Sequence, residues 1–247
     1  MGLTEQPAGR SGHVSGRPAI ADQATTDSYL DAWQAYATTR STGGRTTNTA
    51  GERTWFNWTQ YPDHGPGLEQ LGIRPGARVL ELGCGSGRNL AHAAVHGAEC
   101  VGLDLVELQV ERARRRWTDV PGLLFLQAEA VAYLSRAEAR FDAVFSVFGP
   151  AWFTDPELLL PLVLARLSPG GVFAFSQLPA IDGCHGRQGH YMRMDEVDAR
   201  PVLRWDHPVT EWPTILADHG YVNTTAEILA PPTGQQLGTL LVRGERP

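Results

Sequence analysis

The chain has no lysine, since all 21 of its basic residues are arginine. This absence excludes the lysine of a P-loop nucleotide site, a Schiff-base lysine and a lysine general base. The three cysteines, Cys84, Cys100 and Cys184, are scattered and odd in number, which is typical of neither a disulfide framework nor a zinc site. No apolar run is long enough to span a bilayer, and residues 1–19 lack the apolar segment of a signal peptide. We therefore expect a reduced, cytoplasmic protein without a membrane partner.

Positive charge is also scarce, because the formal net charge is −6 and the sequence pI is about 5.7. Nucleic-acid-binding proteins recruit clustered basic side chains to the phosphate backbone, so this balance argues against a nucleic-acid partner. Arginine without lysine, together with abundant alanine and glycine, indicates a GC-rich bacterial genome. At 247 residues the chain is long enough for one large domain with a small appendage.

The amino-terminal part divides into two segments of different composition. Residues 1–26 are polar and rich in glycine and proline, which predicts a disordered tail. Residues 27–66 are predicted to form a helical and aromatic lid. A helix opens at Asp27, with Tyr29, Trp33 and Tyr36 at helical spacing. The aromatic residues 54–61 are interpreted either as a lid over a pocket or as a hydrophobic plug on the sheet edge.

Residues 67–247 are predicted to form one α/β domain. Short helices at 68–72, 87–96, 107–117, 130–137, 155–167 and 211–219 alternate with apolar segments typical of buried strands. The predicted strands are 78–83, 99–104, 123–128, 141–147, 172–176, 221–229 and 236–243. This alternation predicts a doubly wound, Rossmann-like, seven-stranded and mostly parallel sheet with helices on both faces. Residues 180–209 break the pattern and are predicted to be a substrate-side insertion, with no secondary structure assigned.

The most informative motif follows the first predicted strand, where Gly83, Gly85 and Gly87 occupy alternate positions. Glycines at such a turn let the backbone approach a ligand beyond the carboxyl ends of the strands. A dinucleotide site would have its third glycine one residue later. Glu81 would also repel a pyrophosphate, whereas a carboxylate suits a ligand with an ammonium and a sulfonium. Asp104 ends the second strand and can accept ribose hydroxyls.

The run from Leu71 to Asn89, together with Gly102-Leu-Asp104, resembles the class I S-adenosylmethionine-dependent methyltransferases. The resemblance extends over residues 68–180 and includes the strand Phe141–Ser146 and the turn Leu167–Gly171. It implies S-adenosylmethionine as cofactor. The cofactor-binding residues that it implies are Tyr36, Glu81, Gly83, Gly85, Gly87, Asp104, Leu105, Glu129, Ser146 and Phe148.

The resemblance also implies a role for each of these residues. Glu81 would orient the methionine amino group, the glycines would line the methionine and ribose, and Asp104 would hold the ribose. Leu105 and Glu129 would contact the adenine, with Glu129 standing where the family usually has an aspartate. Ser146 and Phe148 would border the sulfonium, and Tyr36 would fold over the cofactor. Structural interpretations remain open: Glu81 as a structural acid, Asp104 and Glu129 as helix caps, and Tyr36 as core packing.

The residues after the fourth strand, 146–152, lack the Pro-Pro-aromatic signature of DNA amino-methyltransferases, which favours a small-molecule acceptor. His185 and His190 are the candidates for a general base, because unperturbed histidine titrates near neutrality. The alternative is that both are solvent-exposed loop residues. No spacing supports a metal site with Asp182. Three tryptophans either wall an apolar pocket or pack in the core: Trp55, Trp58 and Trp152.

The sequence therefore predicts methyl transfer from S-adenosylmethionine to an oxygen or nitrogen of a small organic molecule, such as a bacterial secondary metabolite. One alternative is a non-catalytic module that binds S-adenosylmethionine or S-adenosylhomocysteine. Another is an enzyme that uses the same fold for cyclisation or aminopropyl transfer. A dehydrogenase is disfavoured by the glycine spacing. No sequence feature indicates an oligomeric state.

Overall fold

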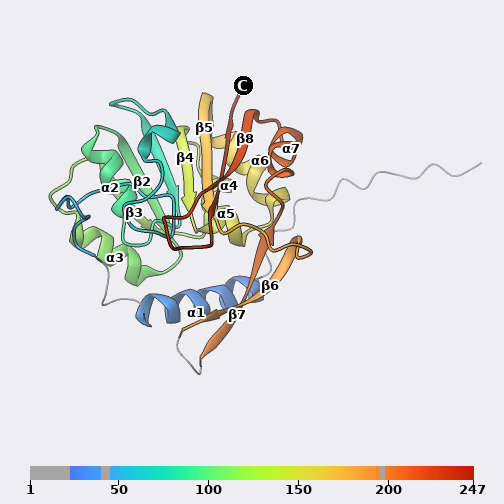
Figure 1. Cartoon of the computed structure of the whole chain (residues 1–247). Coiled ribbons are helices and arrows are strands. Elements are labelled where there is room, and N and C mark those ends of the chain that lie inside the picture. The colour runs from blue at the N-terminus through green and yellow to red at the C-terminus, as the bar shows by residue number, and fades with distance from the viewer. Residues whose placement is uncertain (1–22, 40–44, 195–197) are drawn as a thin grey trace, which may run out of the picture.

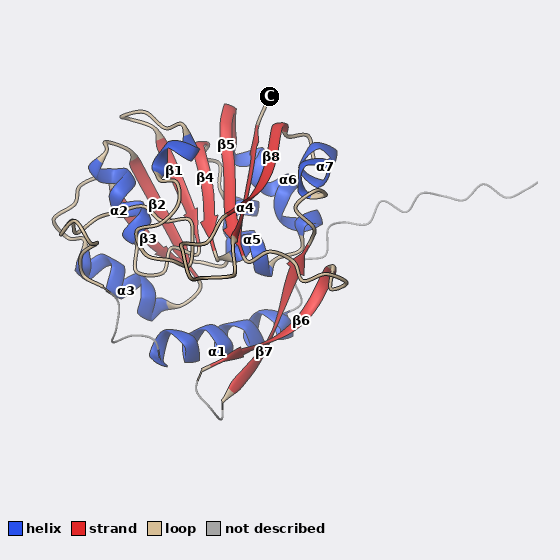
Figure 2. Cartoon of the chain, in the orientation of Figure 1, coloured by secondary structure: helices blue, strands red, loops and turns tan. Residues whose placement is uncertain are grey.

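The computed structural model describes residues 23–39, 45–194 and 198–247. A seven-stranded sheet with the order β3-β2-β1-β4-β5-β9-β8 forms the centre of the molecule (Figures 1 and 2). Neighbouring strands from β3 to β5 are parallel, and β9 is antiparallel to both β5 and β8. The predicted seven-stranded, mostly parallel sheet is confirmed. Its strands are β1 (Arg78–Leu82), β2 (Glu99–Asp104), β3 (Leu123–Gln127), β4 (Phe141–Val147), β5 (Leu167–Gln177), β8 (Val222–Leu229) and β9 (Thr239–Glu245).

Helices cover both faces of the sheet because the strands are apolar on both sides. One buried cluster joins α2 and α3 to the sheet, and a second joins α4, α6 and α7 to the opposite face. The sequence missed α5, a four-residue turn of helix that begins at a proline. The helices are α2 (Arg88–Val95), α3 (Glu107–Arg116), α4 (Ala130–Arg136), α5 (Pro150–Phe153), α6 (Pro156–Arg166), α7 (Trp212–Asp218) and the 3-10 turn η1 (Leu68–Leu71).

The aromatic residues 55–58 form a plug in the core rather than a lid. Trp58 has no exposed surface, and its ring lies 4.9 Å from that of Phe56 and 6.0 Å from that of Phe145 in β4. Both rings belong to the cluster on the face covered by α2 and α3. Burying large aromatic rings against an apolar strand stabilises the fold more than leaving them at a wet opening. Of the two interpretations left open for residues 54–61, the burial of Phe56 and Trp58 matches the hydrophobic plug.

Helix α1 (Gln23–Thr39) includes the segment predicted to be helical and begins before Asp27. Of the predicted tail, residues 23–26 are therefore helical, and residues 1–22 lie outside the described residues. The Arg112 guanidinium of α3 donates to the carbonyl of Ala37 at 2.8 Å. A cation at this end of α1 also complements the helix dipole. These contacts attach α1 to the sheet domain.

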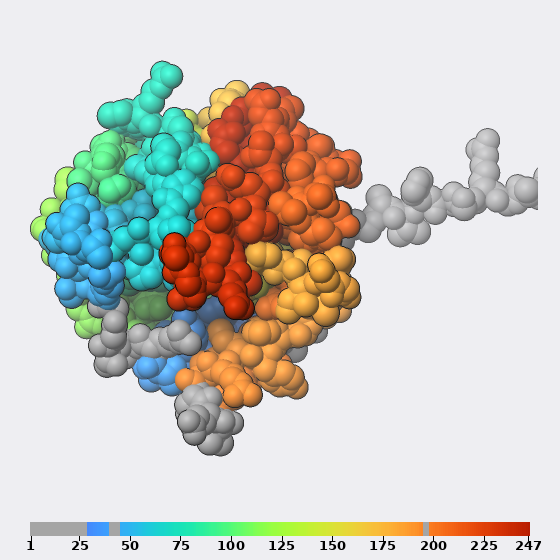
Figure 3. Space-filling model, in the orientation of Figure 1, coloured from blue at the N-terminus to red at the C-terminus, as the bar shows by residue number. Residues whose placement is uncertain are grey.

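The insertion contains a β-hairpin that the sequence did not predict, formed by β6 (Gly186–Arg193) and β7 (Ala199–Asp206). The Tyr29 hydroxyl of α1 lies 3.2 Å from both the backbone nitrogen and the carbonyl oxygen of Leu203 in β7. Figures 1 and 2 show α1 and the hairpin side by side beyond the carboxyl ends of the parallel strands. In the space-filling view, α1 in dark blue and the hairpin in orange form the lower edge of the molecule (Figure 3).

None of the helices in the described part of the chain combines the length and the apolar character that crossing a membrane would require.

Candidate functional site

A cavity of about 1090 Å³ lies at the carboxyl ends of β1, β2 and β4, where the strand order reverses. Ligands of doubly wound sheets bind at this position. We name its two sides by their origin. The sheet wall consists of Gly83, Gly85, Asp104, Leu105 and Glu129, and the lid wall consists of Tyr29, Trp33 and Tyr36 of α1 with Arg187, His190 and Leu203 of the hairpin.

The three glycines of the motif all have a positive φ, but they serve different purposes. At Gly83 (φ 77°) a Cβ atom would lie 2.5 Å from Cδ of Pro150, so the turn excludes a side chain. At Gly85 (φ 51°) a Cβ atom would meet nothing within 4 Å, and the residue lines the cavity. At Gly87 a Cβ atom would collide with the Phe125 ring at 2.6 Å. The structure therefore places Gly87 in the packing of the turn and outside the cavity wall.

Asp104 ends β2 and lines the sheet wall. Its Oδ2 accepts from the Gly85 N–H at 2.8 Å, and its Oδ1 accepts from the Val106 N–H at 2.9 Å. Burial raises the pKa of the carboxyl, and these two backbone hydrogen bonds oppose the shift. Each carboxylate oxygen keeps a further lone pair, so Asp104 can accept hydrogen bonds from a ligand hydroxyl.

Glu81 is only 3% exposed and lies behind the turn rather than in the cavity wall. Its Oε2 has no hydrogen-bond partner among the described residues. Burial raises the pKa of the carboxyl well above its ordinary value, and the charge of Asp104 raises it further. The charge of Arg88 and the backbone N–H of Leu90 oppose the shift. A buried carboxylate with one unpartnered oxygen next to a cavity suits a cationic ligand or an ordered water.

Glu129 caps a helix and also lines the cavity, while its predicted contact with the adenine stays a prediction. Its carboxylate accepts from the N–H groups of Val131 at 2.9 Å and Ala132 at 2.6 Å, which caps α4. It also lines the cavity, as does Leu105, the other residue predicted at the adenine. The cap fixes the position of the carboxylate in the wall.

Ser146 and Phe148 end β4 in different environments. Ser146 is fully buried, and its hydroxyl donates to the carbonyl of Leu82 at 3.1 Å and accepts from the Ala151 N–H at 3.3 Å. It fastens the start of α5 to β1 and does not line the cavity, contrary to the predicted position at the sulfonium. Phe148 does line the cavity, with a left-handed φ of 49° that costs backbone strain.

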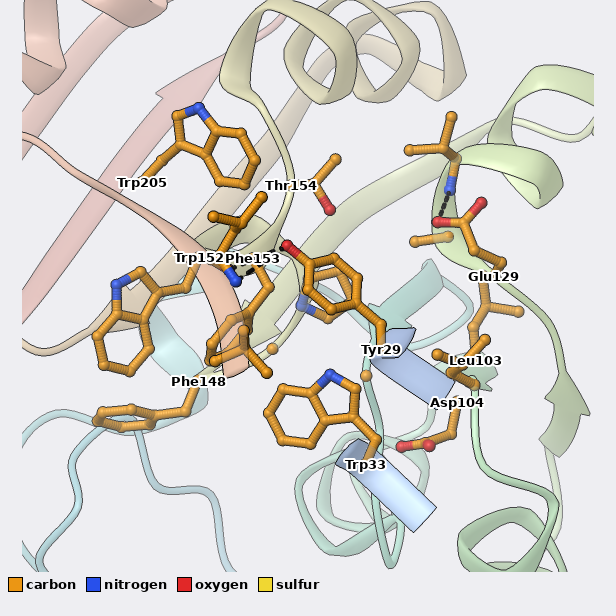
Figure 4. Close-up of a pocket in the computed structure, with 18 of the residues that line it drawn as sticks. Tyr29, Trp33, Leu103, Asp104, Glu129, Phe148, Trp152, Phe153, Thr154 and Trp205 are labelled. Carbon is orange, nitrogen blue, oxygen red and sulfur yellow. Dashed lines mark hydrogen bonds between the residues drawn. The ribbon is translucent and has the colours of Figure 1, made fainter. Parts of the chain in front are cut away.

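Aromatic rings surround the side of the cavity away from the glycine turn. The ring of Trp33 lies 5.7 Å from that of Tyr36 and 4.9 Å from that of Phe153, both edge-on. Figure 4 shows Tyr29 and Trp33 extending from α1 toward Phe148, Trp152 and Phe153. Tyr36, which the resemblance placed over the cofactor, is part of the lid wall.

The fold places the two candidate histidines in different positions relative to the cavity. His190 lies in β6 and lines the cavity, whereas His185 precedes β6 and stays outside the wall. Both residues are exposed. Burial lowers the pKa of His190, the charge of Arg204 lowers it further, and Asp206 opposes the shift. The lowered pKa favours the neutral imidazole, which is the form that can accept a proton. Sequence reasoning paired two histidines that the fold does not bring together.

Several residues of the wall were missed by the sequence analysis. Tyr29 and Trp33 share the helical spacing that singled out Tyr36, so that spacing was the available signal. Arg187 and Trp205 come from the hairpin, whose strand pattern is interrupted by Gly186, Gly189 and Pro201, and gave no such signal. Of the three tryptophans considered for a pocket wall, only Trp152 lines this cavity.

The charges of the sheet wall decide which nucleosides it can hold. Asp104 and Glu129 are its charged groups, and it contains no basic side chain. A pyrophosphate would meet only carboxylates there, whereas ribose hydroxyls and a sulfonium find acceptors. Together with the unpartnered Oε2 of Glu81, this donor and acceptor set fits S-adenosylmethionine better than a dinucleotide. No group of three or more potential metal ligands occurs among the described residues.

Known proteins resemble the chain in the same region. Residues 79–171 match the family model of a methyltransferase domain. A trans-aconitate 2-methyltransferase of Paracidovorax citrulli is 31% identical over 114 residues, which is 45% of this chain and 42% of the relative. A fatty-acid O-methyltransferase of Mycolicibacterium smegmatis is 33% identical over 145 residues, which is 58% of this chain and 43% of the relative. The chain thus spans less than half the length of these relatives.

Solved structures share the fold. A 1,6-didemethyltoxoflavin-N1-methyltransferase of Burkholderia thailandensis, with 1,6-didemethyltoxoflavin and S-adenosylhomocysteine bound, superposes with a TM-score of 0.57 at 21% identity. The match covers 72% of this chain and 73% of that one. An S-adenosylmethionine-dependent methyltransferase of Mesorhizobium loti gives a TM-score of 0.56 at 24% identity, covering 72% and 94% of the two chains.

Proposed function

We propose that the chain transfers a methyl group from S-adenosylmethionine to an oxygen or nitrogen atom of a small organic molecule. Residues 79–171 match the family model of a methyltransferase domain, and the fold is shared with a solved S-adenosylmethionine-dependent methyltransferase. The observation that carries the proposal is the sheet wall, which presents Asp104 beside the glycine turn without any basic side chain. The named activities of the relatives, on trans-aconitate and on fatty acids, support a small-molecule acceptor.

We assign a secondary metabolite as the acceptor and the cytoplasm as the location. The unpaired cysteines Cys84, Cys100 and Cys184 agree with a reducing compartment.

Each polar group around the sheet wall has a function in binding the cofactor. Asp104 would accept the ribose hydroxyls, and Gly85 would let the backbone approach the ligand. Leu105 and Glu129 would flank the adenine, while Glu81 would attract the methionine ammonium, directly or through water. When bound, S-adenosylmethionine supplies an electrophilic methyl group on a sulfonium.

The lid wall contributes alignment, exclusion of water and a base. Aromatic rings restrict the acceptor to orientations in which its nucleophilic atom faces the cofactor, and such alignment accounts for much of the acceleration in displacement reactions. The lid wall also limits the access of water to the site. His190 would accept the proton that an acceptor hydroxyl or ammonium loses.

Two measurements test the proposal. Calorimetric titration with S-adenosylmethionine, S-adenosylhomocysteine and NAD should give binding of the two adenosyl-sulfur compounds only. Binding of NAD alone would overturn the proposal. Incubation with S-adenosylmethionine and a pool of small metabolites should then release S-adenosylhomocysteine. Tight binding without release in any pool would favour the non-catalytic module.

A further inference from the structure

Opposite charges occupy opposite sides of the cavity. The carboxylates that line it come from the sheet domain, at the end of β2 and at the starts of α4 and α6: Asp104, Glu129, Asp155 and Glu157. Among the described residues that line it, Arg187 is the cation, and it comes from β6 of the hairpin, as does His190, whose lowered pKa favours the neutral form. A ligand that spans the cavity therefore meets negative charge toward the sheet and positive charge toward the hairpin.

The two arginines of the hairpin near the cavity differ in their partners. Arg204 of β7 is neutralised, because its Nε lies 2.7 Å from Oδ2 of Asp206. Its guanidinium also lies over the Trp152 ring, 5.2 Å from the centroid, and Trp152 donates to Asp206 at 2.8 Å. Arg187 has no carboxylate within 4.0 Å among the residues that the structure describes. An unpaired guanidinium facing a concave wall presents a planar set of donors that matches a carboxylate or sulfonate.

The rest of the acceptor side is aromatic and spacious. Rings of Trp33, Phe148, Trp152, Phe153 and Trp205 line it, and Trp152 and Phe153 lie 5.2 Å apart. The cavity of about 1090 Å³ slightly exceeds the usual size range of ligand pockets, roughly 300–1,000 Å³, so it has room for more than a nucleoside cofactor. Flat aromatic ligands gain most from walls of this kind.

We propose that the acceptor is a flat aromatic molecule of at least two rings that carries an anionic substituent, and that Arg187 binds this substituent. The assignment rests on the proposed methyltransferase function, since that function makes the second half of the cavity an acceptor site. Arg187 is then a specificity-determining residue, which selects for negative charge at the end of the acceptor remote from the sheet wall.

A pair of fluorescent probes tests this class directly. The probes are 8-anilinonaphthalene-1-sulfonate and N-phenyl-1-naphthylamine, which share two ring systems and differ in the sulfonate. Kd values are measured on the full chain saturated with S-adenosylhomocysteine, whose own binding is followed by calorimetry. The wild type should bind the sulfonate at least tenfold more tightly than the neutral probe. Arg187→Gln should weaken sulfonate binding at least tenfold and change neutral-probe binding less than twofold.

Arg193→Gln is the matched control, because Arg193 lies on the same strand, is exposed and does not line the cavity. It should leave both Kd values unchanged. Equal affinities of the wild type for the two probes, no binding of either probe, or equal losses in the two arginine variants would each overturn the acceptor assignment. If S-adenosylhomocysteine itself fails to bind, the proposed function fails instead, so the two failures are distinguishable.

Discussion

The two walls of the cavity are built in different ways. The sheet wall uses backbone geometry and residues close in sequence: the Gly85 N–H and the Asp104 carboxylate meet across one β-α-β unit. The lid wall uses side chains from segments far apart in sequence, joined by the Tyr29 hydroxyl and the backbone of Leu203. A wall fixed by the turns of a parallel sheet tolerates little change, whereas a wall of side chains on a hairpin can vary without disturbing the core. We infer that the first determines the cofactor and the second the acceptor.

Removal of the base on the lid wall should have the largest effect. We expect His190→Ala to lower turnover by about 10²-fold or more, within the range of general acid–base catalysis. The affinity for S-adenosylhomocysteine should not change, because His190 belongs to the other wall. His185→Ala is the control, since His185 lies outside the cavity. Initial rates and calorimetry measure the two quantities. Full turnover in His190→Ala would remove this base from the mechanism.

The pH dependence gives a second readout of the same residue. Burial and Arg204 lower the pKa of His190 below its ordinary 6.5, with Asp206 opposing. A base is active when unprotonated, so the wild-type rate should be constant from neutral pH downward and then fall as pH drops through a pKa below 6.5. This acid limb should be absent from the residual rate of His190→Ala. If the rate of the variant falls at the same acid pH as that of the wild type, a group other than His190 is responsible for the fall.

On the sheet wall, Asp104→Ala should weaken binding of S-adenosylhomocysteine at least tenfold, or about 1.4 kcal/mol. The variant loses the ribose acceptor and also a partner of the Gly85 N–H. Asp142→Ala controls for the structural part, because Asp142 accepts from the backbone N–H of Arg78 at the opposite end of the sheet. Calorimetry should show the loss in the first variant only. Equal losses would make Asp104 a turn-stabilising residue and not a ligand contact.

The contrast between the walls also explains which parts of the cavity could be predicted from the sequence. The glycine turn and Asp104 were predictable because strand periodicity places them at the same edge of the sheet. Two aromatic segments of similar composition were not separable: Trp58 packs in the core, whereas Trp33 lines the cavity, and the difference depends on tertiary packing. The hairpin was missed because β6 and β7 contain glycine and proline, and because β6 exposes most of its side chains. Arg187 could therefore be assigned to the site only from the structure and not from the sequence.

Glu81 lies behind the sheet wall and should reveal a balance between stability and binding. Its folded-state pKa is raised above the ordinary 4.5, so the ionised carboxylate destabilises the fold once the pH exceeds the unfolded-state value. Glu81→Gln should therefore raise the free energy of unfolding at pH 7 by on the order of 1 kcal/mol, with no gain below pH 4. It should also weaken S-adenosylhomocysteine binding several-fold.

Urea denaturation at pH 7 and pH 4, followed by titration with the ligand, measures both changes. Glu99→Gln is the control on the adjacent strand, where the side chain is exposed and should contribute nothing to either quantity. A less stable Glu81→Gln variant at pH 7 would show that the Arg88 charge outweighs burial at this position. The carboxylate would then be a structural residue.

The most local effect should come from the link within the lid wall. Tyr29→Phe removes the hydroxyl that contacts both backbone groups of Leu203, and we expect a loss of about 0.5–1.5 kcal/mol, the net value of a hydrogen bond. Because the link holds the hairpin and not the sheet, amide hydrogen exchange should accelerate in residues 199–206 and stay unchanged in β1 and β4. Tyr191→Phe, at a side chain 69% exposed on β6, should alter neither region. If the amide hydrogen exchange of β7 is unchanged in Tyr29→Phe, the hydroxyl does not hold the hairpin to α1. The two elements then cover the cavity independently, and each contributes to acceptor specificity separately.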